Sequence, residues 1–251
     1  MSTAQAPVTG IPTTGLVLGP VHSPRLGRVV EVDLVPHKVC PFDCIYCRFG
    51  RTTHKTIMRD LYRDFDVILE QLPAFLHADP EYIVLTGAGD PSGHAQLNQL
   101  VQRIRSVSGV PVAVMTCGAL FWRADVRAEV FDADVVVARL DAGDNATFSA
   151  MNRPHPRITI DDVIEGLKRF NRAFNGSLRL EVTVVAGVND TPLELERIRR
   201  AVRRIKPETL YLSTSAAPRS EEDAPAVTAA RLEEIAAFVG EHAAVLAPER
   251  P

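Results

Sequence analysis

Short apolar runs, each typical of a buried strand, alternate about six times with longer segments in which apolar residues recur at helical spacing. A chain that alternates in this way forms parallel strands joined by right-handed helical crossovers. We therefore predict an α/β fold, a partial (β/α)6 TIM-like barrel that stays partly open. The predicted strands cover residues 29–35, 81–86, 111–116, 133–140, 178–186 and 209–214. The predicted helices cover residues 64–76, 94–108, 122–131, 161–174, 194–206 and 228–240.

The length of 251 residues suits one large, undivided α/β barrel. Residues 1–15 are small, polar and contain proline and glycine, so we expect a flexible N-terminal arm there. A single barrel domain is expected over residues 16–251. Residues 16–28 are interpreted as a hairpin in which Arg25 and Arg28 are solvated rather than in contact with substrate.

The formal net charge of −3 argues against a generally basic nucleic-acid-binding protein, although it leaves room for a local basic patch. No apolar run approaches the ~20 residues that are needed to cross a membrane. The first residues lack the charged and apolar regions of a signal peptide. We therefore expect a cytoplasmic protein with reduced thiols and no membrane partner.

Three of the four cysteines lie within one short stretch. Cys40, Cys44 and Cys47 have the spacing C-x3-C-x2-C, and the remaining cysteine is Cys117. Thiolates at such a spacing can converge on one soft metal centre. A structural zinc site would need a complete tetrahedral set of ligands. Three sulfurs fit better an iron–sulfur cluster in which one iron is left open.

Other interpretations of the cysteines stay open. A zinc site could use His37 or His54 as its fourth ligand, and a structural disulfide is less favoured because nothing marks the chain as secreted. Cys117 is interpreted as an unliganded residue at the top of the barrel, with a ligand or radical-relay role as the minority alternative.

Further motifs fall at the predicted carboxyl ends of strands, where parallel α/β folds bind their ligands. The turn 86–91 reads TGAGDP, and glycines there allow a close backbone approach to a ligand. Asp141, Asn152 and Arg153 follow the fourth strand and could contact a ligand or only make loop hydrogen bonds. The arginine-rich helix 194–206 is interpreted as a solvated face, with nucleic-acid binding as the weaker alternative.

The cysteine spacing, with an aromatic residue at Tyr46, resembles the C-x3-C-x-aromatic-C signature of the radical S-adenosylmethionine (radical SAM) enzymes. The resemblance implies a [4Fe-4S] cluster on Cys40, Cys44 and Cys47, with SAM bound to the fourth iron. It also implies reductive cleavage of SAM to a 5′-deoxyadenosyl radical, which abstracts hydrogen from the substrate. A reductant such as flavodoxin or ferredoxin is then an implied partner.

The same resemblance extends to other parts of the barrel. Gly87, Gly89 and Asp90 lie where the family has a Gly-Gly-Glu region that holds the SAM amino group, with the shorter aspartate in place of glutamate. The segment VVAGVND, which contains Val188, resembles the part of the fifth strand that lines the adenine. Tyr46, Asp141 and Asn152 are the remaining candidates for contact with SAM. No residue is assigned to catalysis on the substrate.

The combination of VDLVPHKVCPFDCIYC, TGAGDP, RLDAGD, MNRPHP and VVAGVND is similar to a group of stand-alone radical SAM proteins that are related to the tRNA wybutosine-synthesis enzymes. Those enzymes imply three further cysteines upstream, whereas no cysteine precedes Cys40 here, so we expect a single cluster. The substrate class stays open between a small molecule, a peptide and a nucleotide. The alternatives are a tRNA-modifying radical SAM enzyme and a non-enzymatic zinc- or RNA-binding module.

Overall fold

The computed structural model describes residues 15–215, 224–240 and 242–246. The predicted arm, apart from Gly15, and part of the acidic loop before the last helix therefore lie outside the described residues. The strands are β1 (Val17–Ser23), β2 (Gly27–Asp33), β3 (Val39–Cys40), β4 (His54–Lys55), β5 (Tyr82–Thr86), β6 (Val112–Thr116), β7 (Val135–Arg139), β8 (Ser177–Val184), β9 (Thr209–Thr214) and β10 (Ala243–Val245). The α-helices are α1 (Phe65–Gln71), α2 (Pro73–Leu76), α3 (Leu97–Val107), α4 (Ala124–Val130), α5 (Asn145–Asn152), α6 (Ile160–Ala173), α7 (Pro192–Ile205) and α8 (Ala229–Val239).

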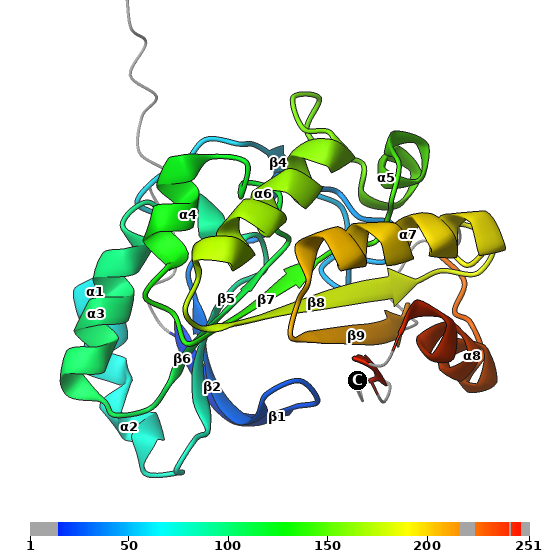
Figure 1. Cartoon of the computed structure of the whole chain (residues 1–251). Helices are drawn as coiled ribbons and strands as arrows, with labels where there is room; N and C mark the ends of the chain where they lie inside the picture. The colour runs from blue at the N-terminus through cyan, green and yellow to red at the C-terminus, as the bar shows by residue number, and fades with distance from the viewer. Residues whose placement is uncertain (1–14, 216–223, 241, 247–251) are drawn as a thin grey trace, which may run out of the picture.

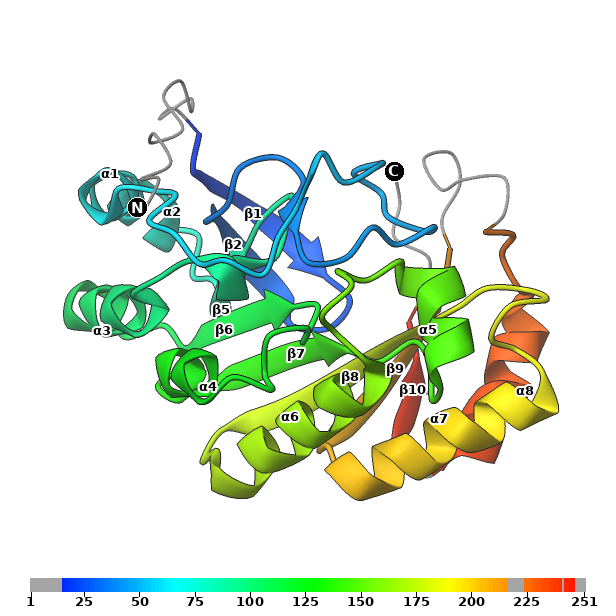
Figure 2. The same ribbon diagram turned by 90° about the horizontal axis from the view of Figure 1, so that it is seen from above.

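One curved sheet of eight strands runs in the order β1-β2-β5-β6-β7-β8-β9-β10, with helices along its outer face (Figures 1 and 2). The strands from β2 through β5 to β9 pair in parallel and in chain order, as the predicted crossovers require. The added edge strands are β1, antiparallel to β2, and β10, parallel to β9. The partial (β/α)6 barrel is thereby confirmed, with one extra strand at each edge of the described sheet.

Side chains alternate between the two faces of each strand, so every strand contributes to two cores. In β7, Val136 and Ala138 pack in the large core under the helices. Val135 and Val137 point to the barrel interior, where they pack with residues such as Tyr211. Because both faces of the sheet are covered, the sequences of its strands are continuous apolar runs.

Several element boundaries differ from the predictions for local reasons. The predicted helix 64–76 divides into α1 and α2, because Pro73 begins a new helix. Helix α3 begins three residues later than predicted, after a 3-10 turn at Pro91–Gly93 and a left-handed Gln96. Thr191 caps α7 as its sequence suggests, but Glu194 does not complete a capping box, because its carboxylate binds Thr147. Within the described part of the chain, no helix has the length and apolar character to cross a membrane.

Candidate active site at the carboxyl ends of the strands

The segment 34–59, called the cysteine loop here, follows β2 and lies on the side of the sheet opposite α3, α4, α6 and α7 (Figure 2). Main-chain hydrogen bonds attach it to the turn after β5: the Lys38 N–H donates to the Ala88 carbonyl at 2.9 Å. They also attach it to the end of α5, since the Ile45 N–H donates to the Met151 carbonyl at 3.0 Å. The loop that carries the three cysteines is thus attached to the turn after β5 and to α5, the helix that follows β7.

All three cysteines are half-buried and carry free thiols. The Lys38 ammonium lies 3.0 Å from the Cys47 sulfur, and the Asn152 amide lies 3.4 Å from the Cys44 sulfur. Burial, followed by the nearby carboxylate of Asp141, raises the pKa of the Cys44 thiol to about 12. Cys44 is therefore a neutral thiol in this state, and binding of a metal would release its proton.

The two glycines of the TGAGDP turn make room for the cysteine loop. A Cβ atom on Gly89 would lie 2.0 Å from the Val39 carbonyl oxygen. A Cβ atom on Gly87 would lie 2.7 Å from a methyl group of Val35. Both glycines therefore allow a close approach, but in this structure the approaching groups are the Val39 carbonyl and the Val35 side chain. The predicted contact of these glycines with SAM stays a prediction.

The substitution Gly89→Ala is expected to lower the free energy of unfolding by about 1–3 kcal/mol, because the loop must move away from the added methyl group. Iron loading should fall with it, since Cys40 directly follows Val39. Gly109→Ala is the matched control, because a Cβ atom there meets nothing within 4 Å. Urea denaturation and iron analysis of both variants measure the effect. Equal stability and equal iron content in the two variants would contradict this account of Gly89.

The side chain of Asp90 is buried, and its hydrogen bonds connect the TGAGDP turn to the end of β6. Its carboxylate accepts hydrogen bonds from Thr116 Oγ1 at 2.6 Å, Ser92 Oγ at 2.8 Å and the Cys117 thiol at 3.0 Å. Burial first, and then contacts with Cys40 and Asp90, raise the pKa of the Cys117 thiol. Cys117 thus lies at the barrel top beside Cys40. The predicted contact of Asp90 with the SAM amino group stays a prediction, and its visible partners are protein donors.

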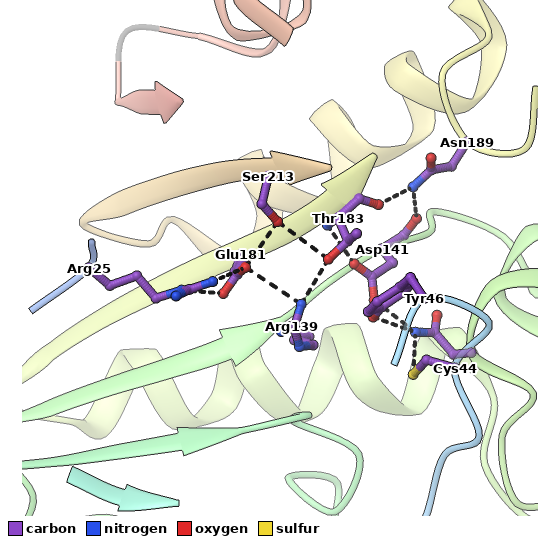
Figure 3. A network of polar contacts seen from close by, with 10 residues as sticks. Arg25, Cys44, Tyr46, Arg139, Asp141, Glu181, Thr183, Asn189 and Ser213 are labelled. Carbon is purple, nitrogen blue, oxygen red and sulfur yellow. Dashed lines mark hydrogen bonds and ion pairs between the residues drawn. The ribbon is translucent and has the colours of Figure 1, made fainter. Parts of the chain in front are cut away.

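Tyr46, Asp141 and Asn152, which are far apart in the sequence, meet in one buried network (Figure 3). The Tyr46 hydroxyl donates to Asp141 Oδ2, and the Asn152 amide donates to the same oxygen at 2.7 Å. The Thr183 N–H donates to Asp141 Oδ1 at 2.8 Å. Burial raises the pKa of Asp141, although Arg139 and these donors act against it. The sequence proposed Tyr46 from the cysteine motif, and Asp141 and Asn152 as residues that follow the fourth strand. The fold brings the three together beside Cys44.

Asn152 also offers an unused acceptor at this place. Its side chain is buried, yet Oδ1 has no hydrogen-bond partner among the described residues. A buried amide oxygen without a donor is costly, so such an atom marks a place where a ligand donor fits. Val188 lies close by, because it packs against the small apolar cluster that contains Ile45, Tyr46 and Met151. Polar and apolar parts of a candidate cofactor site therefore adjoin the cysteine loop.

The network continues into the barrel through Arg139, which sequence reasoning missed. Its guanidinium lies 5.4 Å from the centre of the Tyr46 ring and donates to Thr183 Oγ1 at 2.8 Å. The carboxylate of Glu181 lies 3.6 Å away. Arg139 follows Val135 and Val137 on the inward face of β7, so strand alternation would have found this position.

The interpretation of Arg25 as a solvated residue is wrong. Its side chain is only 7% exposed and forms a two-pronged ion pair with Glu181, at 2.7 Å and 2.6 Å (Figure 3). Burial alone would raise the pKa of Glu181, but the charges and hydrogen bonds of Arg139 and Arg25 lower it to about 2. A buried acid such as Glu181, at an inward position of a strand, requires a cation as partner. This requirement could have indicated a buried arginine.

The remaining candidates from the sequence do not join this network. Arg153 ends α5 in a left-handed conformation, and its carbonyl accepts from Lys55 Nζ at 2.7 Å. On the arginine-rich helix, Arg200 pairs with Glu196 and Arg204 pairs with Glu165. Carboxylates of the same chain therefore already pair with several of the arginines on this helix.

The donor set of the loop fits an iron–sulfur cluster better than a hard metal ion, because its candidates are thiols with N–H donors beside two of them. Among the residues that the structure describes, no three Cys, His, Asp or Glu side chains are grouped closely enough to hold a metal ion as they stand. A bound cluster would have to draw the three sulfurs together, and its binding would release the proton of Cys44.

The sequence model of the radical SAM superfamily matches residues 34–202, from the cysteine loop to α7. The chain belongs to the radical SAM superfamily. The UPF0026 protein of Helicobacter pylori is 30% identical to it over 209 residues, which are 82% of this chain and 68% of that protein. The UPF0026 protein of Methanocaldococcus jannaschii is 29% identical, over 82% of this chain and 65% of its own length. These relatives belong to the group that the sequence motifs indicated.

A protein of Brachyspira hyodysenteriae named GTPase Obg is 35% identical over 222 residues, which are 88% of this chain but 33% of that protein. The radical SAM chain described here therefore spans one third to about two thirds of these relatives.

Solved structures of radical SAM proteins share the fold. Streptococcus suis SuiB bound to S-adenosylmethionine superposes with a TM-score of 0.65 and 11% identity, over 87% of this chain and 51% of SuiB. A radical SAM methyltransferase from Sphaerobacter thermophilus gives a TM-score of 0.59 and 19% identity, over 86% of this chain and 65% of that one. At these identities the likeness concerns the fold alone.

Proposed function

We propose that this radical SAM enzyme holds a [4Fe-4S] cluster through Cys40, Cys44 and Cys47 and binds SAM beside it, at the Tyr46–Asp141–Asn152 network. When bound, these groups supply reductive cleavage of SAM and a 5′-deoxyadenosyl radical that abstracts hydrogen from the substrate. The observation that carries the proposal is the position of the three-thiol loop. It lies at the carboxyl ends of the strands, next to a buried polar network with an unused acceptor.

The residues around the sulfurs have roles that follow from their contacts. The Lys38 ammonium donates a hydrogen bond to the Cys47 sulfur at 3.0 Å. The Asn152 amide provides a hydrogen bond to the Cys44 sulfur, and hydrogen bonds to sulfur tune iron–sulfur centres. Its Oδ1 remains available to a donor on the cofactor, such as an amino or hydroxyl group. Asp141 and Tyr46 hold this amide in place.

The small apolar cluster around Tyr46 excludes water from one side of the candidate site. Ile45, Tyr46, Met151 and Val185 are buried together, and Val188 packs against them. A dry wall beside a reactive site prevents side reactions with solvent. Val188 is thereby a candidate for contact with the apolar face of the SAM adenine.

We place the substrate at the barrel mouth, close to this site, without assigning its class. The upper interior is polar, with Arg139, Thr183 and Ser213 on neighbouring strands. One fold neighbour, SuiB, has been solved with its precursor peptide SuiA, at 12% identity. A peptide is therefore one candidate beside a small molecule or a nucleotide.

Anaerobic reconstitution with iron and sulfide tests the proposal. We expect about four irons per chain, and formation of 5′-deoxyadenosine when dithionite and SAM are added. Metal analysis of the protein as isolated should show iron rather than zinc. Stoichiometric zinc without SAM cleavage would overturn the proposal and leave a structural metal site.

A further inference from the structure

Cys117 carries a thiol that has no role in the proposed function. It directly follows β6, at the barrel top, and it is free and half-buried. It packs against the same apolar core as Cys40, which lies at the end of β3. Two neighbouring thiols can be joined as a disulfide when an oxidant removes their two hydrogens. The surroundings of Cys117 therefore decide whether it has a thiol within reach.

A short chain of contacts connects Cys117 to Cys40. The Cys117 thiol donates to Asp90 Oδ2 at 3.0 Å. The Asp90 N–H in turn donates to the carbonyl of Val39 at 3.2 Å, and Val39 directly precedes Cys40. The Cys117 thiol is also in contact with the Cys40 thiol itself. The fold therefore holds these two thiols side by side, although they are far apart in the sequence.

The other two thiols of the cysteine loop have partners of a different kind. The Cys44 sulfur accepts a hydrogen bond from the Asn152 amide at 3.4 Å. The Cys47 sulfur accepts one from the Lys38 ammonium at 3.0 Å. The first thiol of the loop is therefore the one that Cys117 contacts.

We propose that Cys40 and Cys117 form a reversible disulfide when the cluster has been lost and an oxidant such as hydrogen peroxide reaches the barrel top. The inference rests on the proposed function in one respect, which is that Cys40 serves as a cluster ligand. A cysteine that is oxidised as far as sulfinic acid is not recovered by thiols, whereas a disulfide is. The bridge would therefore preserve this ligand, and it would block assembly of a new cluster until it is reduced.

The chemistry takes two steps and needs one peroxide. The Cys40 sulfur attacks one oxygen of hydrogen peroxide, the O–O bond breaks, and a sulfenic acid and one water are formed. The Cys117 sulfur then attacks the sulfenic sulfur, so that the S–S bond forms and the S–O bond breaks. Asp90 already accepts the S–H hydrogen bond, so it can pass this proton to the departing hydroxide, which becomes the second water. Two thiols and one peroxide thus give one disulfide and two waters.

Variants with two cysteines each test the pairing. Because the chain has four cysteines, Cys44→Ala/Cys47→Ala keeps only Cys40 and Cys117. The matched control Cys40→Ala/Cys47→Ala has the same number of thiols but keeps Cys44 beside Cys117. The iron-free proteins are treated with equimolar hydrogen peroxide, and disulfides are identified by mass spectrometry of unreduced peptides. Circular dichroism checks that each variant is folded.

The wild type is mapped in the same way, so the test does not depend on a double variant that folds. A Cys40–Cys44 bridge is the competing product, because Cys44 also lies near Cys40. In a second arm, wild type and Cys117→Ala are treated with peroxide and then with dithiothreitol. Both are finally reconstituted with iron and sulfide, and their iron content is compared with that of untreated protein.

We expect Cys44→Ala/Cys47→Ala to form an intramolecular disulfide about tenfold faster than the control, since its two thiols are already in contact. The wild type should give the Cys40–Cys117 bridge as its main product. After dithiothreitol, the wild type should regain its iron loading. The loading of treated Cys117→Ala should be lower by about twofold or more, because Cys40 then proceeds to sulfinic acid.

Equal rates in Cys44→Ala/Cys47→Ala and its control, or a wild-type map dominated by a Cys40–Cys44 bridge, would overturn the pairing. Full recovery of iron loading by treated Cys117→Ala would overturn the protective role. If the Cys40–Cys117 bridge forms but the reconstituted wild type never cleaves SAM with dithionite, the redox site stands and the proposed function fails.

Discussion

Replacement of Cys40, Cys44 or Cys47 by alanine is expected to abolish the cluster and reduce SAM cleavage to background, whereas Cys117→Ala should retain both. Each of the three thiols lies on the cysteine loop, whereas the fourth cysteine, Cys117, follows β6 and its thiol donates to Asp90. Mutation of a residue that only orients a metal ligand lowers metal affinity or activity by about 10–100-fold. Mutation of a ligand itself should therefore have a larger effect. Iron and sulfide analysis and a 5′-deoxyadenosine assay measure the effect.

Cys117 is the matched control, because it is the same residue type, half-buried and adjacent to Cys40. Its thiol is held by Asp90, at the end of a neighbouring strand. The cysteine assignment is wrong if Cys44→Ala still binds a full cluster, or if Cys117→Ala loses it. Circular dichroism of the iron-free variants separates loss of ligation from loss of the fold.

The second large effect concerns the buried ion pair inside the barrel. Glu181→Gln keeps the shape of the side chain but leaves Arg25 and Arg139 without their shared carboxylate. Removing one partner of such a pair costs about 3–5 kcal/mol in the free energy of unfolding. Urea denaturation of the iron-free protein at neutral pH measures it. The double variant Arg25→Met/Glu181→Leu should recover part of the loss, because it removes one of the two unpaired charges and fills the space with apolar atoms.

The same ion pair makes stability depend on pH in the acid range. The pKa of Glu181 lies at about 2 in the folded protein, against an ordinary value of 4.5. Its contribution is therefore complete above pH 4.5 and is lost as the pH falls through about 2. A shift of this size corresponds to about 3 kcal/mol. The difference in stability between the wild type and Glu181→Gln should shrink over that range, and a constant difference would show that the carboxylate charge is not responsible.

The barrel could be predicted from the sequence because its signals are local. The strand predicted at residues 209–214 has the bounds of β9. Buried parallel strands give continuous apolar runs, and helix starts carry their own caps, as Thr159 and Thr191 do for α6 and α7. The positions of the candidate residues in the fold could also be predicted in outline, since each lies at or just past the carboxyl end of a strand, on the cysteine loop, or near the end of α5.

What the sequence could not provide are contacts between distant residues. Arg25 and Glu181 are separated by 156 positions, and no local pattern joins them. The packing of Gly89 against Val39 could likewise not be predicted, because the sequence of a glycine-rich turn does not show which group will approach it. Both contacts depend on how the hairpin and the cysteine loop pack against the finished barrel.

The cysteine loop is held in place mainly by peptide groups. The N–H groups of Lys38, Asp43 and Ile45 donate to carbonyls of the β5 turn and of α5, and neither partner uses a side chain. These attachments are therefore indifferent to the identity of the attached residues, with the exception of proline, which has no N–H to give. The course of the loop can persist through wide changes in its side chains. The same framework can then present cysteines in one place while the surrounding surface changes to suit different partners.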